Sequence, residues 1–371
     1  MGLLFALAFI IQLELLLSVF IRIFFLPKAK SLPMADRKPV SIVICAKNEA
    51  ANLSKNLPFI LCQNYLNEEG VPNFEVIVVN DGSADDTIQV LEGFAKNHSH
   101  LNIVNLLPNE IRLFKGKKHA LGKGVNATQN DWLLFTDADC KPSSERWLEL
   151  MVAPLATGKE IILGYGGYNT TIGLLNAFIR WETLHTFMLY STAAQSGRPY
   201  MAVGRNMACI KSVFLQAQES SIWNAVPSGD DDLLVSVVAT QVNTQVVSDK
   251  SAFTYSDAKE TWGAWARQKQ RHLSTGKFYK QGIKTYLTLY AGGHTMVWMF
   301  FIATAIVHPT TLLFGAMGLR CFLYWAIWLK TADRVNEKSL FYFFPLFDLG
   351  WMIYNFAFLP YIIWKNKKHW T

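Results

Sequence analysis

The sequence predicts an α/β protein in which a doubly wound sheet domain is flanked by apolar segments at both ends of the chain. Short runs of branched apolar residues alternate with helix-length segments between residues 39 and 136, which is the order of a parallel sheet with crossover helices. One such run, residues 132–136, stops at Asp137 and Asp139, and ligand-binding side chains gather at the carboxyl ends of such strands. In addition, 51% of the 371 residues are hydrophobic, which indicates membrane spans.

The first apolar segment, residues 1–27, predicts one tilted transmembrane helix. Basic residues follow this segment rather than precede it, at Lys28, Lys30, Arg37 and Lys38. This order argues against a secretory signal peptide and, by the positive-inside rule, places the chain after residue 30 in the cytoplasm. Glu14 lies near the middle of the span, where an ionisable group is costly, so we expect it to pack against other spans.

The domain predicted for residues 39–280 consists of alternating strands and helices. Strands are expected at residues 40–45, 74–80, 101–106, 132–136, 161–165 and 201–209. Helices are expected at residues 48–62, 84–97 and 119–129. Asn48 is a candidate N-cap of the first helix, and acidic residues at the start of the second suit the helix dipole. The predicted sheet is parallel in its first half and mixed as a whole.

The last part of the chain, residues 286–364, is again apolar. Its three apolar stretches cover residues 286–307, 310–329 and 340–364. Three spans after a cytoplasmic domain would place Lys365, Lys367 and Lys368 outside, against the positive-inside rule. We therefore expect one stretch to be re-entrant or interfacial, and the third, which contains Asp348, is the preferred one.

The formal net charge of +7 points to membrane lipids, because many Lys and Arg residues flank apolar stretches. A nucleic-acid partner is disfavoured, since aromatic residues are not interleaved on a basic face. The five cysteines are scattered and form no CxxC pair. Their distribution argues against a disulfide framework or a zinc site and indicates a reducing compartment.

The carboxyl edge of the predicted sheet carries several polar motifs. Asp137 and Asp139 point to the same side of an extended strand and could converge on one Mg²⁺ or Mn²⁺ ion. Asp81 follows the second strand and could accept a hydrogen bond from a nucleobase N–H, while Gly82 permits close backbone approach. The alternative for each motif is an ordinary solvated turn.

Three more motifs follow the sheet edge along the chain. The cations of residues 115–118 could neutralise a diphosphate, and the alternative is a solvated loop. The three adjacent carboxylates 230–232 repel one another, so one with a raised pKa could accept a proton, although a helix N-cap explains them equally well. Arg271, one helical turn after Gln268, could hold a leaving phosphate, or the segment could be a basic helix held by anionic lipid.

In their order, these motifs resemble those of family 2 glycosyltransferases, which are inverting nucleotide-sugar enzymes with the GT-A fold. The resemblance covers about residues 39–280 together with the arrangement of membrane helices. The matching positions are Ala46 and Glu49, residues 79–83, residues 116–121, Asp137 to Asp139, residues 230–232, and Gln268 with Arg271. The strength of the resemblance lies in the order and spacing of all six motifs.

The resemblance implies roles for individual residues. The implied donor-binding residues are Ala46, Glu49, Asp81, Lys117, Asp137, Gln268 and Arg271. A divalent cation, Mg²⁺ or Mn²⁺, is implied on Asp139 and Asp137. The implied general base lies in the acidic patch, where alignment favours Asp231 and leaves Asp230 and Asp232 open. The implied acceptor side consists of Gly204, Arg205, Asn206 and His272.

One departure from the family pattern bears on the product. Processive synthases of the family usually have Trp after the Arg of this motif, and this chain has His272. We therefore expect a single transfer, and processive polysaccharide synthesis is the alternative. The expected donor is a UDP-sugar, and the expected acceptor is a lipid-linked or envelope glycan. With the basic residues that follow the first apolar segment, we expect an integral protein of the bacterial inner membrane with a cytoplasmic catalytic domain. The non-enzyme alternative is an inactive membrane scaffold that binds nucleotide sugars.

Overall fold

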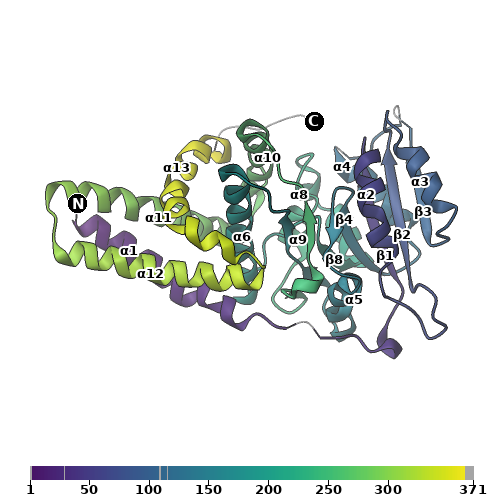
Figure 1. Ribbon diagram of the computed structural model, residues 1–371, viewed down its shortest axis with the longest axis horizontal. Coiled ribbons are helices and arrows are strands. Elements are labelled where there is room, and N and C mark those ends of the chain that lie inside the picture. The colour runs from purple at the N-terminus through teal and green to yellow at the C-terminus, as the bar shows by residue number, and fades with distance from the viewer. Residues whose placement is uncertain (1, 29, 108–109, 115, 364–371) are drawn as a thin grey trace. The chain divides into compact units, whose positions relative to one another are not determined.

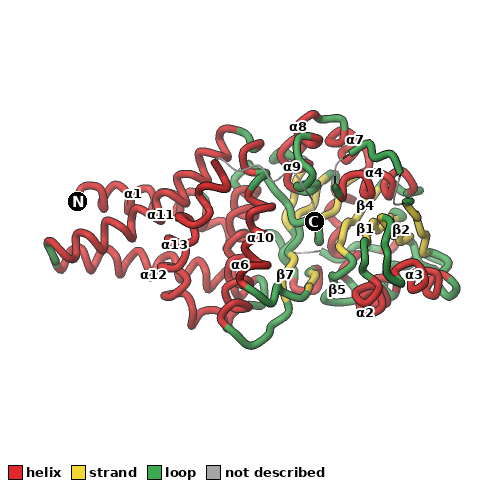
Figure 2. Tube along the Cα trace, turned by 90° about the horizontal axis from the view of Figure 1, so that it is seen from above, coloured by secondary structure: helices red, strands yellow, loops and turns green. Residues whose placement is uncertain are grey.

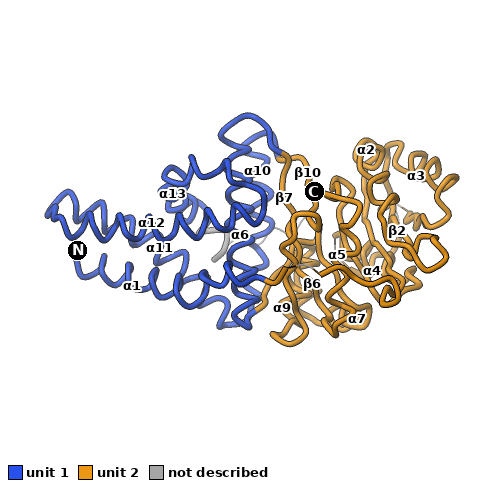
Figure 3. Tube along the Cα trace, turned by 60° about the horizontal axis from the view of Figure 1, so that its bottom comes forward, with its two compact units in different colours: residues 1–26, 170–198, 259–366 blue, residues 27–169, 199–258, 367–371 orange. Residues whose placement is uncertain are grey.

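The computed structural model of the chain, shown in Figure 1, describes residues 2–28, 30–107, 110–114 and 116–363. The described residues form two compact units. Unit 1 comprises residues 2–26, 170–198 and 259–363, and unit 2 comprises residues 27–169 and 199–258. The strands of the described chain all lie in unit 2, where Figure 2 shows them in yellow. Figure 3 colours the two units separately.

Unit 2 is organised around a seven-stranded mixed sheet in the order β3-β2-β1-β4-β8-β6-β9. These strands are β1 (Val40–Ala46), β2 (Phe74–Asp81), β3 (Leu101–Leu106), β4 (Trp132–Asp137), β6 (Ile161–Leu163), β8 (Met207–Ile210) and β9 (Thr244–Val246). The first four strands run parallel, whereas β8 is antiparallel to both β4 and β6. A second sheet joins β5 (Lys141–Pro142), β10 (Thr254–Ser256) and β7 (Gly166–Tyr168). The predicted doubly wound mixed sheet is confirmed.

Helices cover both faces of the large sheet. The helices of unit 2 are α2 (Ala50–Leu61), α3 (Thr87–Ala95), α4 (Lys117–Ala127), α5 (Trp147–Val152), α7 (Lys211–Gln218), α8 (Ser221–Asn224) and α9 (Asp232–Val238), of which α8 and α9 pack on α7. Alternate residues of β2 serve different faces, because Val78 packs in the core with α2, α3 and α5 while Val79 packs with α4. A Cβ on Gly124 of α4 would lie 2.8 Å from side-chain atoms of Val43 and Val79. Glycine at this position therefore lets α4 lie directly on β1 and β2.

Several element boundaries differ from the predicted ones because of contacts between loops. Asn48 is not a helix cap: it has φ +58°, and its side-chain carbonyl accepts the N–H of Ala84 at 2.8 Å. The first helix consequently begins at Ala50, and the second begins at Thr87 rather than at residue 84. The predicted strand 201–209 is confined to Met207–Ile210. A hydrogen bond between loops thus removes Asn48 from the predicted cap position.

Unit 1 is helical. Its helices are α1 (Gly2–Ser18), α6 (Leu174–Gln195), α10 (Trp262–Leu273), α11 (Gln281–Val307), α12 (Thr311–Arg334) and α13 (Phe344–Ile363). Three segments are long and apolar enough to cross a membrane, namely Gly2–Phe25, Gln281–Val307 and Thr311–Arg334. The units cut across the predicted segments, since α6 and α10 belong to unit 1 although both lie within residues 39–280. The basic residues after 364 lie outside the described residues.

A buried polar network joins four helices of unit 1. Arg320 on α12 pairs with Asp348 on α13, and it also donates to the side chains of Gln12 at 3.2 Å and His294 at 3.0 Å. All four side chains are buried. Glu14, which we expected to pack against other spans, instead has an exposed side chain. Gln12 is the polar residue of α1 that packs inward, because it lies on the helix face turned toward α11 and α12.

Candidate functional site

Two carboxylates and a thiol converge at the carboxyl end of β4. The ligand atoms of Asp137, Asp139 and Cys140 lie within 4.8 Å of one another. The Cys140 thiol, which sequence reasoning missed, donates to Oδ1 of Asp139 at 3.4 Å. Burial and then the negative charge of Asp137 raise the pKa of Asp139. A divalent cation would relieve this repulsion, and paired carboxylates are the oxygen ligands that such ions prefer, so the residues present fit the predicted metal.

Lys117 lies next to the carboxylates at the end of β4 and lines one pocket with Asp230 and Asp231 of the acidic patch. It is the first residue of α4, and its ammonium group pairs with Asp137. Burial lowers the pKa of Lys117, but the charges of Asp137 and Asp230 outweigh burial and raise that pKa above its ordinary range. The preceding Gly116 has φ +65°, and a Cβ there would lie 2.5 Å from the carbonyl oxygen of Pro227. Glycine therefore brings the start of α4 against the loop before the acidic patch.

The neighbouring Lys118 does not face the site. Its side chain is buried, its ammonium donates to the carbonyls of Trp223 and of Val226, the latter at 2.9 Å, and it lies 4.9 Å from the centre of the Trp223 ring. The suggestion that all cations of residues 115–118 meet a diphosphate is thus wrong for Lys118, which instead holds the loop after α8. Lys115 lies outside the described residues.

Asp231 is held by two backbone N–H groups. Its Oδ1 accepts from the N–H of Asp232 at 2.8 Å, and its Oδ2 accepts from the N–H of Gly204 at 2.6 Å. Burial and then the charge of Asp230 raise the pKa of Asp231 from 3.8 to about 6. Asp231 also occupies the N-cap position of α9, so the N-cap and the predicted proton acceptor are one residue. Asp230 is half-buried and Asp232 is buried.

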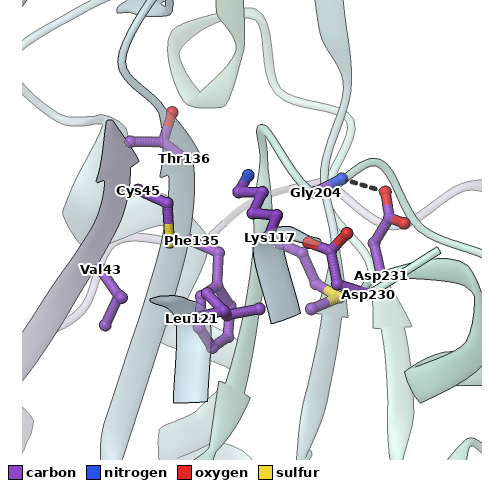
Figure 4. A pocket seen from close by; sticks show the side chains of 10 residues that line it. Val43, Cys45, Lys117, Leu121, Phe135, Thr136, Gly204, Asp230 and Asp231 are labelled. Carbon is purple, nitrogen blue, oxygen red and sulfur yellow. Dashed lines mark hydrogen bonds between the residues drawn. The ribbon is translucent and has the colours of Figure 1, made fainter. Parts of the chain in front are cut away.

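A small pocket collects these groups. Its polar lining comes from five elements or loops and comprises Cys45, Lys117, Thr136, Gly204, Asp230 and Asp231. Figure 4 shows the Lys117 side chain between Cys45 on one side and Gly204 and Asp230 on the other. Burial raises the pKa of Cys45 to about 12, which keeps this thiol protonated at neutral pH. Lys117 and the predicted acidic patch therefore line the same pocket.

The predicted nucleoside contacts lie at the same sheet edge. Ala46 ends β1 and is paired in register with Asn80, one residue before Asp81 ends β2. Glu49 precedes α2, and its N–H donates to the Thr87 hydroxyl at 3.0 Å. Parallel pairing thus places Ala46 beside the end of β2, next to Asp81, and Glu49 follows β1 at the same sheet edge.

Sequence reasoning missed the partner of Asp81. Arg112 donates from Nη2 to Oδ1 of Asp81 at 2.6 Å and from Nη1 to Oδ2 at 3.2 Å. Asp81 is 2% exposed. Arg112 lies in no recognisable motif, and it is 31 positions from Asp81. The sequence alone therefore does not predict this ion pair.

On the predicted acceptor side, Gly204 lines the pocket and Arg205 is anchored nearby. The Arg205 guanidinium donates to the carbonyl of Gly166 at 2.5 Å and lies 4.2 Å from the centre of the Tyr168 ring. Asn206 has no exposed surface. Its amide is held by the Trp147 indole and by two backbone carbonyls, at 2.8–2.9 Å. Asn206 therefore fixes the backbone before β8 and does not make the predicted acceptor contact.

Gln268, Arg271 and His272 lie on α10, which belongs to unit 1. Gln268 and Arg271 are half-buried and His272 is exposed. Between them Lys269 pairs with the buried Glu182 of α6. The donor and acceptor contacts predicted for these three residues stay predictions.

Comparison with known proteins agrees with this geometry. Residues 41–214 match the family model described as Glycosyl transferase family 2. Probable glycosyltransferase YdaM of Bacillus subtilis is 25% identical over 245 residues, which are 64% of this chain and 55% of that protein. Glycosyltransferase AglE of Haloferax volcanii is 32% identical over 126 residues, 34% of this chain and 38% of that protein. The chain thus spans about half or less of the length of these relatives.

A solved structure shares the fold over most of the chain. Mannosyltransferase PcManGT from Pyrobaculum calidifontis, solved in complex with GDP-Man and Mn²⁺, superposes with a TM-score of 0.59 at 16% sequence identity. The match covers 93% of this chain and 96% of that chain. The likeness confirms the GT-A fold predicted from the sequence.

Proposed function

We propose a reaction and a mechanism for this chain, which belongs to glycosyl transferase family 2. It moves a sugar from a nucleotide-sugar donor to an acceptor hydroxyl in one inverting displacement. The observation that carries the proposal is Lys117, which pairs with Asp137 and borders the same pocket as Asp230 and Asp231. The donor-binding residues and the proton acceptor are thereby adjacent, as a direct transfer requires.

The leaving group is a nucleoside diphosphate, and the site is built to hold its charge. Asp139 and Asp137 would hold a divalent cation, which neutralises charge on the leaving diphosphate when bound. The Lys117 ammonium supplies a second positive charge at a fixed position. Asp81 ends β2, which lies on the other side of β1 from β4, and it binds the nucleobase.

Asp231 acts as the general base. The acceptor hydroxyl gives its proton to the Asp231 carboxylate while its oxygen forms a bond to the anomeric carbon. The bond from that carbon to the diphosphate oxygen breaks, and its electron pair leaves with the nucleoside diphosphate. The backbone N–H groups of Gly204 and Asp232 fix the carboxylate in place, and a pKa of about 6 leaves it mostly ionised at neutral pH.

The donor we propose is a UDP-sugar, and the acceptor is a lipid-linked or envelope glycan at the cytoplasmic face of the bacterial inner membrane. The candidate spans and the basic residues after the first of them support this placement. His272, in place of the Trp of processive synthases, supports a single transfer.

The test uses the full chain purified in detergent, with Mn²⁺ and a panel of UDP-sugars and GDP-mannose. Asp231→Asn should lower kcat about 10²–10⁴-fold and leave nucleotide affinity unchanged. Asp139→Asn should weaken Mn²⁺ binding, measured by electron paramagnetic resonance. Asp86→Asn is the matched control, because Asp86 is exposed and its side chain makes no cap hydrogen bond. Unchanged turnover in both site variants would show that these residues are not the active site.

A further inference from the structure

We propose that Arg112 is a built-in competitor for the nucleobase, because its guanidinium binds the same carboxylate oxygens of Asp81 that the base must use. The proposal rests on the proposed function, in which Asp81 is the base contact. It adds a residue that the family match and the sequence motifs leave without a role. Donor binding would then be an exchange reaction in which the base displaces Arg112 from Asp81.

The geometry leaves little room for both partners. The two nitrogens of Arg112 each approach a different oxygen of Asp81, at 2.6 and 3.2 Å. This fork occupies the open edge of the carboxylate, since the Asp81 side chain is only 3% exposed. A carboxylate offers about four acceptor positions, but with Asp81 buried a ring N–H of a nucleobase could approach it only by the edge that the fork takes. The two donors therefore exclude each other.

Arg112 can leave Asp81 without releasing the segment that carries it. Glu110 pairs with Lys123 of α4 at 2.5 Å, and the N–H of Leu113 donates to Nδ1 of His119 at 3.1 Å. These contacts tie down the residues on both sides of Arg112. The Arg112 side chain is itself 31% exposed, so solvent is available to it once it is displaced.

The competition reduces the apparent affinity for the base by the fraction of time that Asp81 is occupied. A charge-assisted pair between a buried carboxylate and a partly exposed guanidinium shifts an equilibrium constant by roughly tenfold. Removal of the guanidinium should therefore tighten nucleotide binding about tenfold. Arg112→Lys keeps the charge but loses the fork and should give an intermediate gain.

The test measures dissociation constants by calorimetry on the full chain in detergent with saturating Mn²⁺. The probes are UDP, GDP and inorganic pyrophosphate, which lacks a base. Arg112→Ala should bind the preferred nucleoside diphosphate about tenfold more tightly than the wild type and leave pyrophosphate affinity unchanged. Lys96→Ala is the matched control, because it removes one exposed positive charge at the end of α3 and should change neither affinity.

Two outcomes would overturn the proposal. Weaker nucleotide binding by Arg112→Ala would make Arg112 a donor ligand, and unchanged binding would show that the pair does not compete. An Asp81→Asn background separates this proposal from the proposed function. If Asp81→Asn weakens nucleotide binding, the base contact holds, and Arg112→Ala should then have no further effect. If Asp81→Asn binds as the wild type does, the base contact itself is wrong and the competition falls with it.

Discussion

The acid side of the pH–rate profile tests the assignment of Asp231 most directly. Burial and the charge of Asp230 raise the pKa of Asp231 from 3.8 to about 6. A general base must be deprotonated, so activity is present above this pKa and is lost as the pH falls through it. With a pKa of about 6, roughly 90% of Asp231 is ionised at pH 7 and roughly 10% at pH 5, so kcat/KM should fall about tenfold between them.

Asp230→Asn is the informative perturbation, because it removes the neighbouring charge and preserves the shape of the side chain. Burial is the larger cause of the raised pKa of Asp231 and remains in the variant. The midpoint of the acid limb should therefore move below pH 6 and stay above 3.8. The direction follows from repulsion, since a carboxylate ionises more readily when a nearby negative charge is removed.

The assay records kcat/KM for sugar transfer from pH 4.5 to 8 at saturating Mn²⁺, for the wild type and for Asp230→Asn. Asp86→Asn should leave the profile unchanged, because Asp86 is exposed at the N-cap position of α3 and its side chain makes no cap hydrogen bond. An acid limb that stays at the same pH in Asp230→Asn would refute the electrostatic reasoning. Loss of all activity in Asp230→Asn, with activity retained in Asp231→Asn, would identify Asp230 as the base.

Two further predictions concern stability. A Cβ on Gly124 would lie 2.8 Å from valines of β1 and β2, so Gly124→Ala should lower the free energy of unfolding, measured in urea, by about 1–3 kcal/mol. Gly93→Ala is the control and should not lower it, because a Cβ on Gly93 would meet open space. Arg320→Met leaves Asp348 buried without its cation and should lower the thermal midpoint in detergent, and adding Asp348→Leu should restore most of the loss. A double variant less stable than the single one would contradict this.

Much of the catalytic edge could be predicted from the sequence because strand periodicity places it. The strands ending at Asp81 and Asp137 are continuous apolar runs, and parallel pairing with β1 puts their ends at one edge. The acidic patch was found by its composition, although composition left Asp230 and Asp231 equivalent. Tertiary contacts separated them, since the N–H of Gly204 reaches only Asp231 among the described hydrogen bonds of the patch.

The sequence by itself determined the fold class, the apolar helices and the residue types at the sheet edge, because these follow from local periodicity and composition. The tertiary structure decided which side chains face the site. It buried Lys118 and Asn206 against backbone carbonyls, and it turned Gln12 rather than Glu14 inward. It also set Arg112 on the buried Asp81. The physical reason is the same for each of these side chains. Its position is fixed by partners that are distant in the sequence, and a local sequence pattern cannot identify such partners.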